Sequence, residues 1–577
     1  MAGFGSLYVV GSSRLLYSYG LYNGGPVALW TGMVVTTIFM CITAASFAEI
    51  CSSIPLSGSI YVWAAEAGGK KYGRLFGFIV AYWASTAWTS FVASNTQGTT
   101  NYMLAELTVF NSYFPGGGLD DSNVKFRAVQ WACSEVFLLG AIMSNLLSRA
   151  LPSPLLGLNG ADDFPPVAKN FTWIFKASAA IIFIDFMLTI IWLPVGVSKT
   201  YGFQSAKWVF TEYYNGSGAV RSFREPRLYL LNKADPLAHQ PDVWNFMLVY
   251  LSTSGVVTGW DASGHIAEET KNASVASARG MFWSCAASGI LSIPLIILFS
   301  FCSPDLDTLF NIYSPQPFTN IYQMALGKGG GMVMTIVAIV GLFINTSLAV
   351  TAASRLVFAI ARDGILPGSS WIGKVDKNGQ PKNAIIFIGA IAAILLCTIL
   401  PSSVAFTSLI SLPVVVAEGG NGLTLRSSRR LIFTRGDFAN AKWSNGRWSV
   451  PFCIISVIFN STLALSHRKV AEECSLTPFA FFLSAFLLAV LLSPLEFPVN
   501  AQNMNFACAI FGGVTIFGLI SYWIVPEEKW LAARQVRQML DAAHAQQVAH
   551  KTDDVEQAGT ADHAESQAKT SALDHSA

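Results

Sequence analysis

Apolar residues come along the chain in blocks of about twenty, separated by short polar stretches. A helix that rises 1.5 Å per residue needs about 20 residues to cross roughly 30 Å of hydrocarbon. The pattern therefore predicts an all-α polytopic membrane protein with about twelve transmembrane helices. The predicted spans are Gly3–Leu21, Val27–Glu49, Leu75–Leu107, Ala128–Leu147, Phe175–Val197, Trp244–Gly264, Gly280–Cys302, Gly331–Ile360, Ala384–Leu400, Ala405–Leu425, Pro451–Leu465 or alternatively Pro478–Leu495, and Phe506–Val525.

Lys and Arg residues gather in alternate loops, which predicts the orientation because short basic loops favour the cytoplasm. The strongest cluster follows the tenth predicted span, whereas the turns around Asn23, Pro401 and Pro498 carry neither residue. We therefore expect both termini in the cytoplasm. The permease domain is predicted to cover residues 1–525, and the polar residues 526–577 a partly disordered cytoplasmic tail.

Composition agrees with a membrane protein, since 53% of the 577 residues are hydrophobic and 12% are charged. The formal net charge of +2, with no basic face, gives no reason to expect a nucleic-acid partner. The nine cysteines form no metal-binding spacing, and we expect no metal and no cofactor. The sequence lacks the features expected of a membrane enzyme, a seven-span receptor or a channel. A transporter is therefore favoured, with a non-transporting nutrient sensor as an alternative.

Ionisable residues inside predicted spans are few. Each costs about 2.5–3.5 kcal/mol on insertion scales, so each is a functional candidate by default. They are Arg14, Glu49, Glu106, Glu135, Asp185, Asp261, His265 and Glu418. The alternative for those close to span ends, such as Glu49 and Glu106, is a structural role in contact with headgroup water.

Glycine and hydroxyl residues interrupt two spans. Ser252–His265 breaks the sixth span, and Gly11, Ser12 and Ser13 fall in the first. Paired interruptions at corresponding positions of two halves indicate discontinuous helices, whose free backbone groups can bind a substrate. The alternative is that these small residues only allow close helix packing.

Five motifs occur in a specific order: Asn23–Pro26, Ala48–Gly58, Trp260–Asn272, Ala353–Pro367 and Pro498–Asn505. In these motifs the chain resembles the amino acid-polyamine-organocation (APC) superfamily, and more closely the fungal permeases for amino acids, 4-aminobutyrate (GABA) and choline. The resemblance implies a five-plus-five inverted-repeat transporter fold with two extra helices. It also implies a substrate site between spans one, three, six, eight and ten, and a proton symporter driven by the proton gradient.

The same resemblance implies roles for particular residues. Those expected at the substrate are Gly11, Ser12, Ser13, Thr258, Gly259, Trp260 and Asp261, with Asp261 opposite an amine. Those expected in gating or coupling are Glu49, His265, Glu268, Glu269, Arg279, Arg362 and Asp363. The expected partners are an amino acid or related amine, protons and the lipid bilayer, with choline or a polyamine as the alternative substrate. The plasma membrane is the expected location and the vacuolar membrane the alternative.

Departures from the family pattern concern the first, tenth and eleventh spans. Met1 begins inside the expected first span, and Arg14 stands where small residues are usual. In the tenth span, Val414–Asn421 replaces the expected small-residue pattern. Ser461–Phe482 contains charges that a single span would carry at high cost. We hypothesise that this segment is translated intron or frame-shifted sequence in a gene model, and sequencing of the transcript would decide this.

Overall fold

The computed structural model describes residues 2–110, 123–147, 172–214, 242–376, 379–401, 441–460 and 506–526, together with positions 112, 114–115, 118–119, 408–411, 413–414 and 530. Within these residues all regular structure is helical. The helices are α1 (Ala2–Leu7), α2 (Val9–Ser53), α3 (Ile60–Val109), α4 (Val124–Leu147), α6 (Thr172–Lys199), α7 (Ala206–Thr211), α10 (Asp242–Val257), α11 (Ala262–His265), α12 (Ala273–Cys302), α13 (Leu306–Asn311), α14 (Phe318–Arg362), α15 (Ser369–Ile372), α16 (Lys382–Leu396), α18 (Ser449–Asn460) and α21 (Ala507–Ile524).

The three longest helices each contain a sharp turn at a glycine in the left-handed region, namely Gly25, Gly69 and Gly327. The apolar segment Gly3–Ser53 is 51 residues long, which is enough for two crossings, and the two meet at Gly25 and Pro26. The described residues hold eight helical segments long and apolar enough to cross a membrane. The prediction of an all-helical polytopic membrane protein is confirmed.

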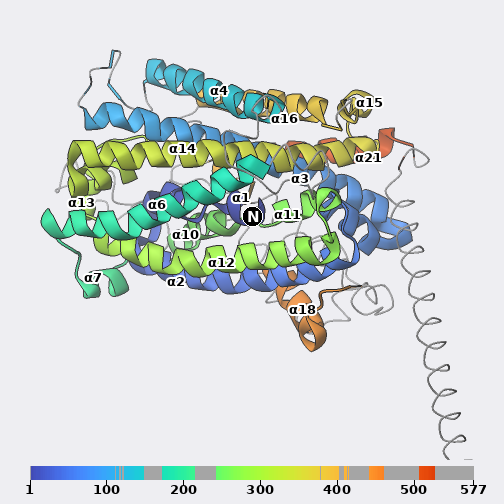
Figure 1. The fold of residues 1–577 in the computed structure, drawn as a ribbon, viewed down its shortest axis with the longest axis horizontal. Helices are drawn as coiled ribbons and strands as arrows, with labels where there is room; N and C mark the ends of the chain where they lie inside the picture. The colour runs from blue at the N-terminus through green and yellow to red at the C-terminus, as the bar shows by residue number, and fades with distance from the viewer. Residues whose placement is uncertain are drawn as a thin grey trace, which may run out of the picture.

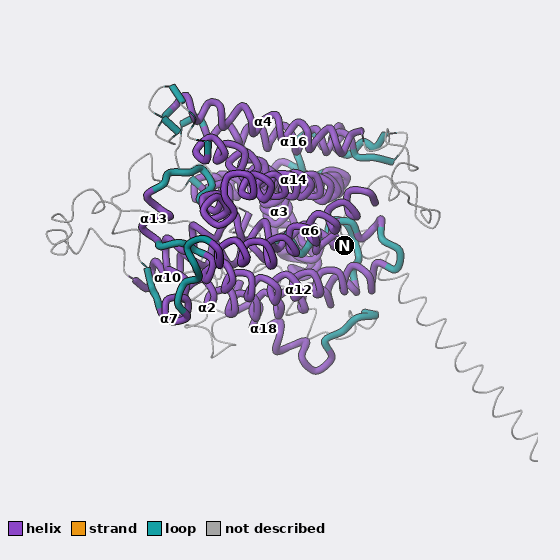
Figure 2. Tube along the Cα trace, turned by 60° about the vertical axis from the view of Figure 1, so that its left-hand side comes forward, coloured by secondary structure: helices purple, strands orange, loops and turns teal. Residues whose placement is uncertain are grey.

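The long helices lie side by side in layers (Figure 1). Helices α4 and α16 form one outer layer and pack on α3 and α14, whereas α2 packs most extensively on α10 and α12 on the opposite side. The view in Figure 2 shows the same separation, with α18 beyond α2. Two packed groups of helices thus enclose the short segments α1 and α11.

Two of these helices are broken within the bundle. The sixth span stops at Val257 and resumes at Ala262, which confirms the predicted interruption there. The first span is broken at Tyr8, between α1 and α2, and the placement of its break at Gly11–Ser13 is wrong. Those three residues lie within the first turns of α2, because the Ser12 N–H already donates to the Tyr8 carbonyl (2.9 Å).

Several predictions concern residues outside the described part of the chain. The segment Ser461–Phe482, the alternative span Pro478–Leu495 and Glu418 fall there, as do most of the tenth span and nearly all of residues 526–577. The hypothesis about the gene model and the division of the chain at residue 525 stay predictions.

Candidate functional site

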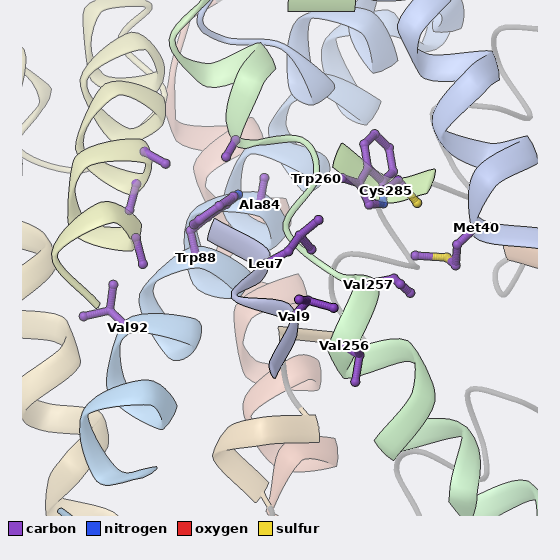
Figure 3. Packing of buried hydrophobic residues seen from close by; sticks show 14 of the residues in the cluster. Leu7, Val9, Met40, Ala84, Trp88, Val92, Val256, Val257, Trp260 and Cys285 are labelled. Atoms are coloured by element: carbon purple, nitrogen blue, oxygen red, sulfur yellow. The ribbon is translucent and has the colours of Figure 1, made fainter. Parts of the chain in front are cut away.

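The two broken spans touch each other at their breaks. The Ser6 hydroxyl of α1 donates to the Gly259 carbonyl (2.9 Å), and Gly259 has a φ of 108°, which a glycine adopts without steric cost. Leu7 and Val9 lie on either side of the first break, between α3 and the end of α10 (Figure 3). The unwound backbone of both spans is therefore at the centre of the bundle.

One asparagine bonds two carbonyl groups beside the first break, and a second asparagine holds the first in place. The Asn345 side chain of α14 donates to the carbonyls of Gly5 and Ser6, both at 2.9 Å. Asn95 of α3 in turn donates to the Asn345 side-chain oxygen (2.5 Å). Buried carbonyl groups without a partner are costly, so these amides fix the α3–α14 pair of helices against α1.

A small cavity of about 30 Å³ adjoins these breaks and is partly open to the exterior. Its wall comes from the first, third, sixth and tenth spans, which are four of the five spans that the family resemblance implies; no residue of the eighth span is among the described lining residues. The lining residues are Ser12, Leu15, Leu16, Phe91, Ser94, Asn95, Gly255, Thr258, Ile410, Pro413 and Val414. The wall is mostly apolar, carries hydroxyl and amide groups, and has no charged side chain among these residues.

Of the residues predicted to bind substrate, Ser12 and Thr258 line this cavity. Gly11 and Ser13 are buried on other faces of α2, and Trp260 packs with Phe47 (ring centroids 5.5 Å apart). Sequence reasoning missed Phe91, Ser94 and Asn95 of α3. Their polar and aromatic side chains in an apolar helix were the only local signal for them.

Asp261 lies one turn beyond Thr258 and forms a small polar group with α3. Its carboxylate Oδ2 accepts from Trp88 Nε1 (3.2 Å) and pairs with His265 Nε2 (3.1 Å). His265 is fully buried, and its Nδ1 bonds the Ser59 hydroxyl (2.8 Å). The Asp261 side chain remains 14% exposed. The group leads from the break in the sixth span to Ser59, two residues from Ser57, whose N–H donates to Glu268 at the α15 end.

Ion pairs cross between the two helix groups at the α15 end. Arg362 of α14 pairs with Glu268 (3.0 Å), and Arg355 pairs with Glu269 (3.1 Å). The Tyr61 hydroxyl donates to Asp363 (2.6 Å), and burial raises the pKa of the Asp363 carboxyl. Four of the predicted gating residues, Glu268, Glu269, Arg362 and Asp363, therefore lie together here, whereas Arg279 is exposed on α12.

Glu49 lies apart from this group and holds a loop. Its carboxylate accepts from the hydroxyls of Ser444 (2.7 Å) and Ser449 (2.6 Å) and from the amide of Asn445 (3.2 Å). These contacts attach residues 444–449, which precede and begin α18, to the end of α2. The arrangement matches the structural alternative for Glu49 more closely than a gating role.

A second buried charge group lies behind the cavity wall. Arg14 and Asp185, both fully buried, form an ion pair through two bonds of 3.0 and 2.9 Å. The Tyr8 hydroxyl donates to the Asp185 carboxylate (2.6 Å), and the Arg14 guanidinium donates to the Tyr322 hydroxyl (2.5 Å). Sequence reasoning named Arg14 and Asp185 separately but had no means to pair them.

Comparison with known proteins gives one family for most of the chain. Residues 1–514 match the family model described as amino acid permease. The chain is 43% identical over 557 residues to the thiamine transporter thi9 of Schizosaccharomyces pombe, covering 95% of this chain and 85% of the relative. It is 25% identical over 538 residues to the amino-acid permease BAT1 homolog of Oryza sativa subsp. japonica, covering 91% and 89%. A solved manganese transporter of Eremococcus coleocola is similar with a TM-score of 0.46 and 12% identity, over 93% and 94% of the two chains.

Proposed function

This chain belongs to the amino acid permease family of multi-pass membrane transporters, and from that premise we propose that it carries thiamine or a closely related organic cation. The observation that carries this proposal is the 43% identity to the thiamine transporter thi9 across 95% of the chain. The identity to the plant amino-acid permease is lower, at 25%.

The chemistry of the cavity supports an aromatic organic cation. Thiamine joins a positively charged thiazolium ring to an aminopyrimidine, and aromatic faces attract such cations. Phe91 lines the cavity, and Trp88 lies one turn away on the same helix and bonds the Asp261 carboxylate. No Lys or Arg is among the described residues that line the cavity. Asp261 is the carboxylate proposed to balance the substrate's charge.

Coupling to protons is a further part of the proposal. Asp261, His265 and Ser59 form a continuous hydrogen-bonded chain from beside the cavity toward the α15 end. Ionisable groups held inside a membrane bundle are typical proton relays in transporters. We propose that protons leave the site through these three residues. The α15 end would then face the cytoplasm. The proposed location of the protein is the plasma membrane, with the vacuolar membrane as the alternative.

The test is uptake of labelled thiamine by a yeast strain that lacks its own thiamine transporter. Saturable uptake that is faster at acidic pH and abolished by an uncoupler supports the proposal. Asp261→Asn should lower the apparent affinity for thiamine at least tenfold, while Glu49→Gln serves as a control outside the cavity. If the protein reaches the cell surface and takes up no thiamine, the proposal that it carries thiamine is wrong.

An amino acid or GABA is the second candidate substrate. The similarity to the amino-acid permease BAT1 homolog of Oryza sativa subsp. japonica supports an amino acid. Choline and polyamines, which are also cations, complete the panel. The same cells therefore receive each labelled compound in turn. Uptake of GABA or an amino acid without thiamine uptake would replace the first candidate with the second.

A further inference from the structure

The Tyr8 ring occupies a slot between the first and eighth spans. A Cβ atom built on Gly11 would lie 2.1 Å from this ring, and one on Gly341 would lie 2.0 Å from the Tyr8 hydroxyl. Only glycine leaves room at both positions. Tyr8 also has a φ of 38°, a left-handed value that is rare for an aromatic residue. Packing therefore holds this side chain against the start of α2.

The start of a broken helix in a transporter is where a substrate carboxylate commonly binds, because the helix N-terminus carries partial positive charge. In this chain the ring of Tyr8 covers Gly11 in the first turn of α2. The nearest cation, Arg14, and the Tyr8 hydroxyl direct their bonds to Asp185, which α6 supplies. Two side-chain donors beside this break, the Tyr8 hydroxyl and the Arg14 guanidinium, are thus engaged by a carboxylate that belongs to the protein.

We propose that Asp185 is a built-in carboxylate that engages the donors beside the first break and thereby excludes substrates with a carboxylate of their own. This inference rests on the proposed function, since it narrows the substrates of the same cavity to cations without a carboxylate. Tyr8, which bonds Asp185, packs in one cluster with Leu15, Ile410 and Val414, all three of which line the cavity. The Arg14–Asp185 pair therefore lies directly behind the cavity wall.

The experiment uses the full chain and competition against whichever labelled compound it transports. The probes are pairs that differ in one carboxylate: choline and glycine betaine, 4-amino-1-butanol and 4-aminobutyrate, and thiamine and its analogue with the hydroxyethyl arm oxidised to a carboxymethyl group. In the native protein we expect the carboxylated member of each pair to compete at least tenfold less well. Equal or better competition by the carboxylated members overturns the inference.

Asp185→Asn tests the residue itself. Because Arg14 then lacks its counter-charge, the preference within each pair should shrink at least tenfold, and Asp185→Glu should restore it. The matched control is Arg14→Gln combined with Asp185→Asn, which releases no cation and should keep the ratio within threefold of the native value. An Asp185→Asn chain that reaches the membrane with an unchanged ratio contradicts the inference.

Two further arrangements keep the result interpretable. If Asp185→Asn does not reach the membrane, Tyr8→Phe removes one bond to Asp185 but leaves the ring in its slot, and a shift of about twofold to threefold is expected; no shift counts against the inference. If the chain transports an uncarboxylated amine but not thiamine, the proposed function fails while the inference stands. If it prefers a carboxylated amine, both fail.

Discussion

The Glu268–Arg362 pair at the α15 end and the Arg14–Asp185 pair have similar lengths but very different surroundings. The side chains of Arg362 and Glu268 are 30% and 32% exposed, whereas those of Arg14 and Asp185 are both 0% exposed. Exposed pairs contribute about 0–1 kcal/mol, because water competes for both ions. Removing one partner of a buried pair costs about 3–5 kcal/mol, because the other charge is left without compensation.

The difference separates contacts that a transport cycle can break from contacts that it must keep. The Glu268–Arg362 pair joins the two helix groups and can open at small cost, as a gate requires. The neighbouring Glu269–Arg355 pair is costlier to open, because the Arg355 side chain is only 3% exposed. The Arg14–Asp185 pair also joins different spans, but separating its ions in the bundle interior would cost far more. We therefore treat the Glu268–Arg362 pair as a gate and the Arg14–Asp185 pair as a permanent part of the site.

The largest expected effect tests the permanence of the buried pair. Arg14→Leu leaves the Asp185 carboxylate buried without its cation, and we expect a loss of about 3–5 kcal/mol in stability. Thermal unfolding of the detergent-solubilised protein and its level at the membrane measure this. Arg362→Leu at the exposed pair should cost less than about 1 kcal/mol. Equal losses in the two variants would remove the distinction.

A smaller effect tests the slot that holds Tyr8 beside this pair. Gly341→Ala places a methyl group against the Tyr8 hydroxyl, and overpacking of this kind costs about 1–3 kcal/mol. Gly329→Ala in the same helix is the control, since nothing lies within 4 Å of its added methyl group. The melting temperature of Gly341→Ala should be lower than that of Gly329→Ala. If both variants melt alike, Tyr8 is free to leave the slot.

The smallest change in stability is expected at the gate. Glu268→Gln should alter stability by less than about 1 kcal/mol but should open the α15 end more often. Hydrogen–deuterium exchange of residues 266–270 should therefore become several-fold faster. The charge-reversed pair Glu268→Arg with Arg362→Glu should restore the native rate. Unchanged exchange in Glu268→Gln would show that this pair does not control opening.

Local sequence pattern predicted some of the residues that line the cavity and missed others. Thr258 was predicted because glycines and hydroxyls interrupt an apolar run, a signal contained in a few consecutive residues. Phe91 and Asn95 carry no such signal, because an apolar helix with scattered polar residues is compatible with several orientations. Their role follows only from the tertiary structure, in which α3 packs on α14 and places Phe91 and Asn95 in the same cavity wall as Ser12 and Thr258.

The sequence by itself determined the membrane setting, the positions of most spans and the break in the sixth span. These depend on the length of apolar runs and on helix-breaking residues, which are local properties of the chain. Only the tertiary structure decided that the first break lies at Tyr8 and that Arg14 meets Asp185, 171 residues away. Both depend on distant residues, since Gly341 makes room for the Tyr8 ring and α6 supplies the carboxylate that allows a cation to be buried.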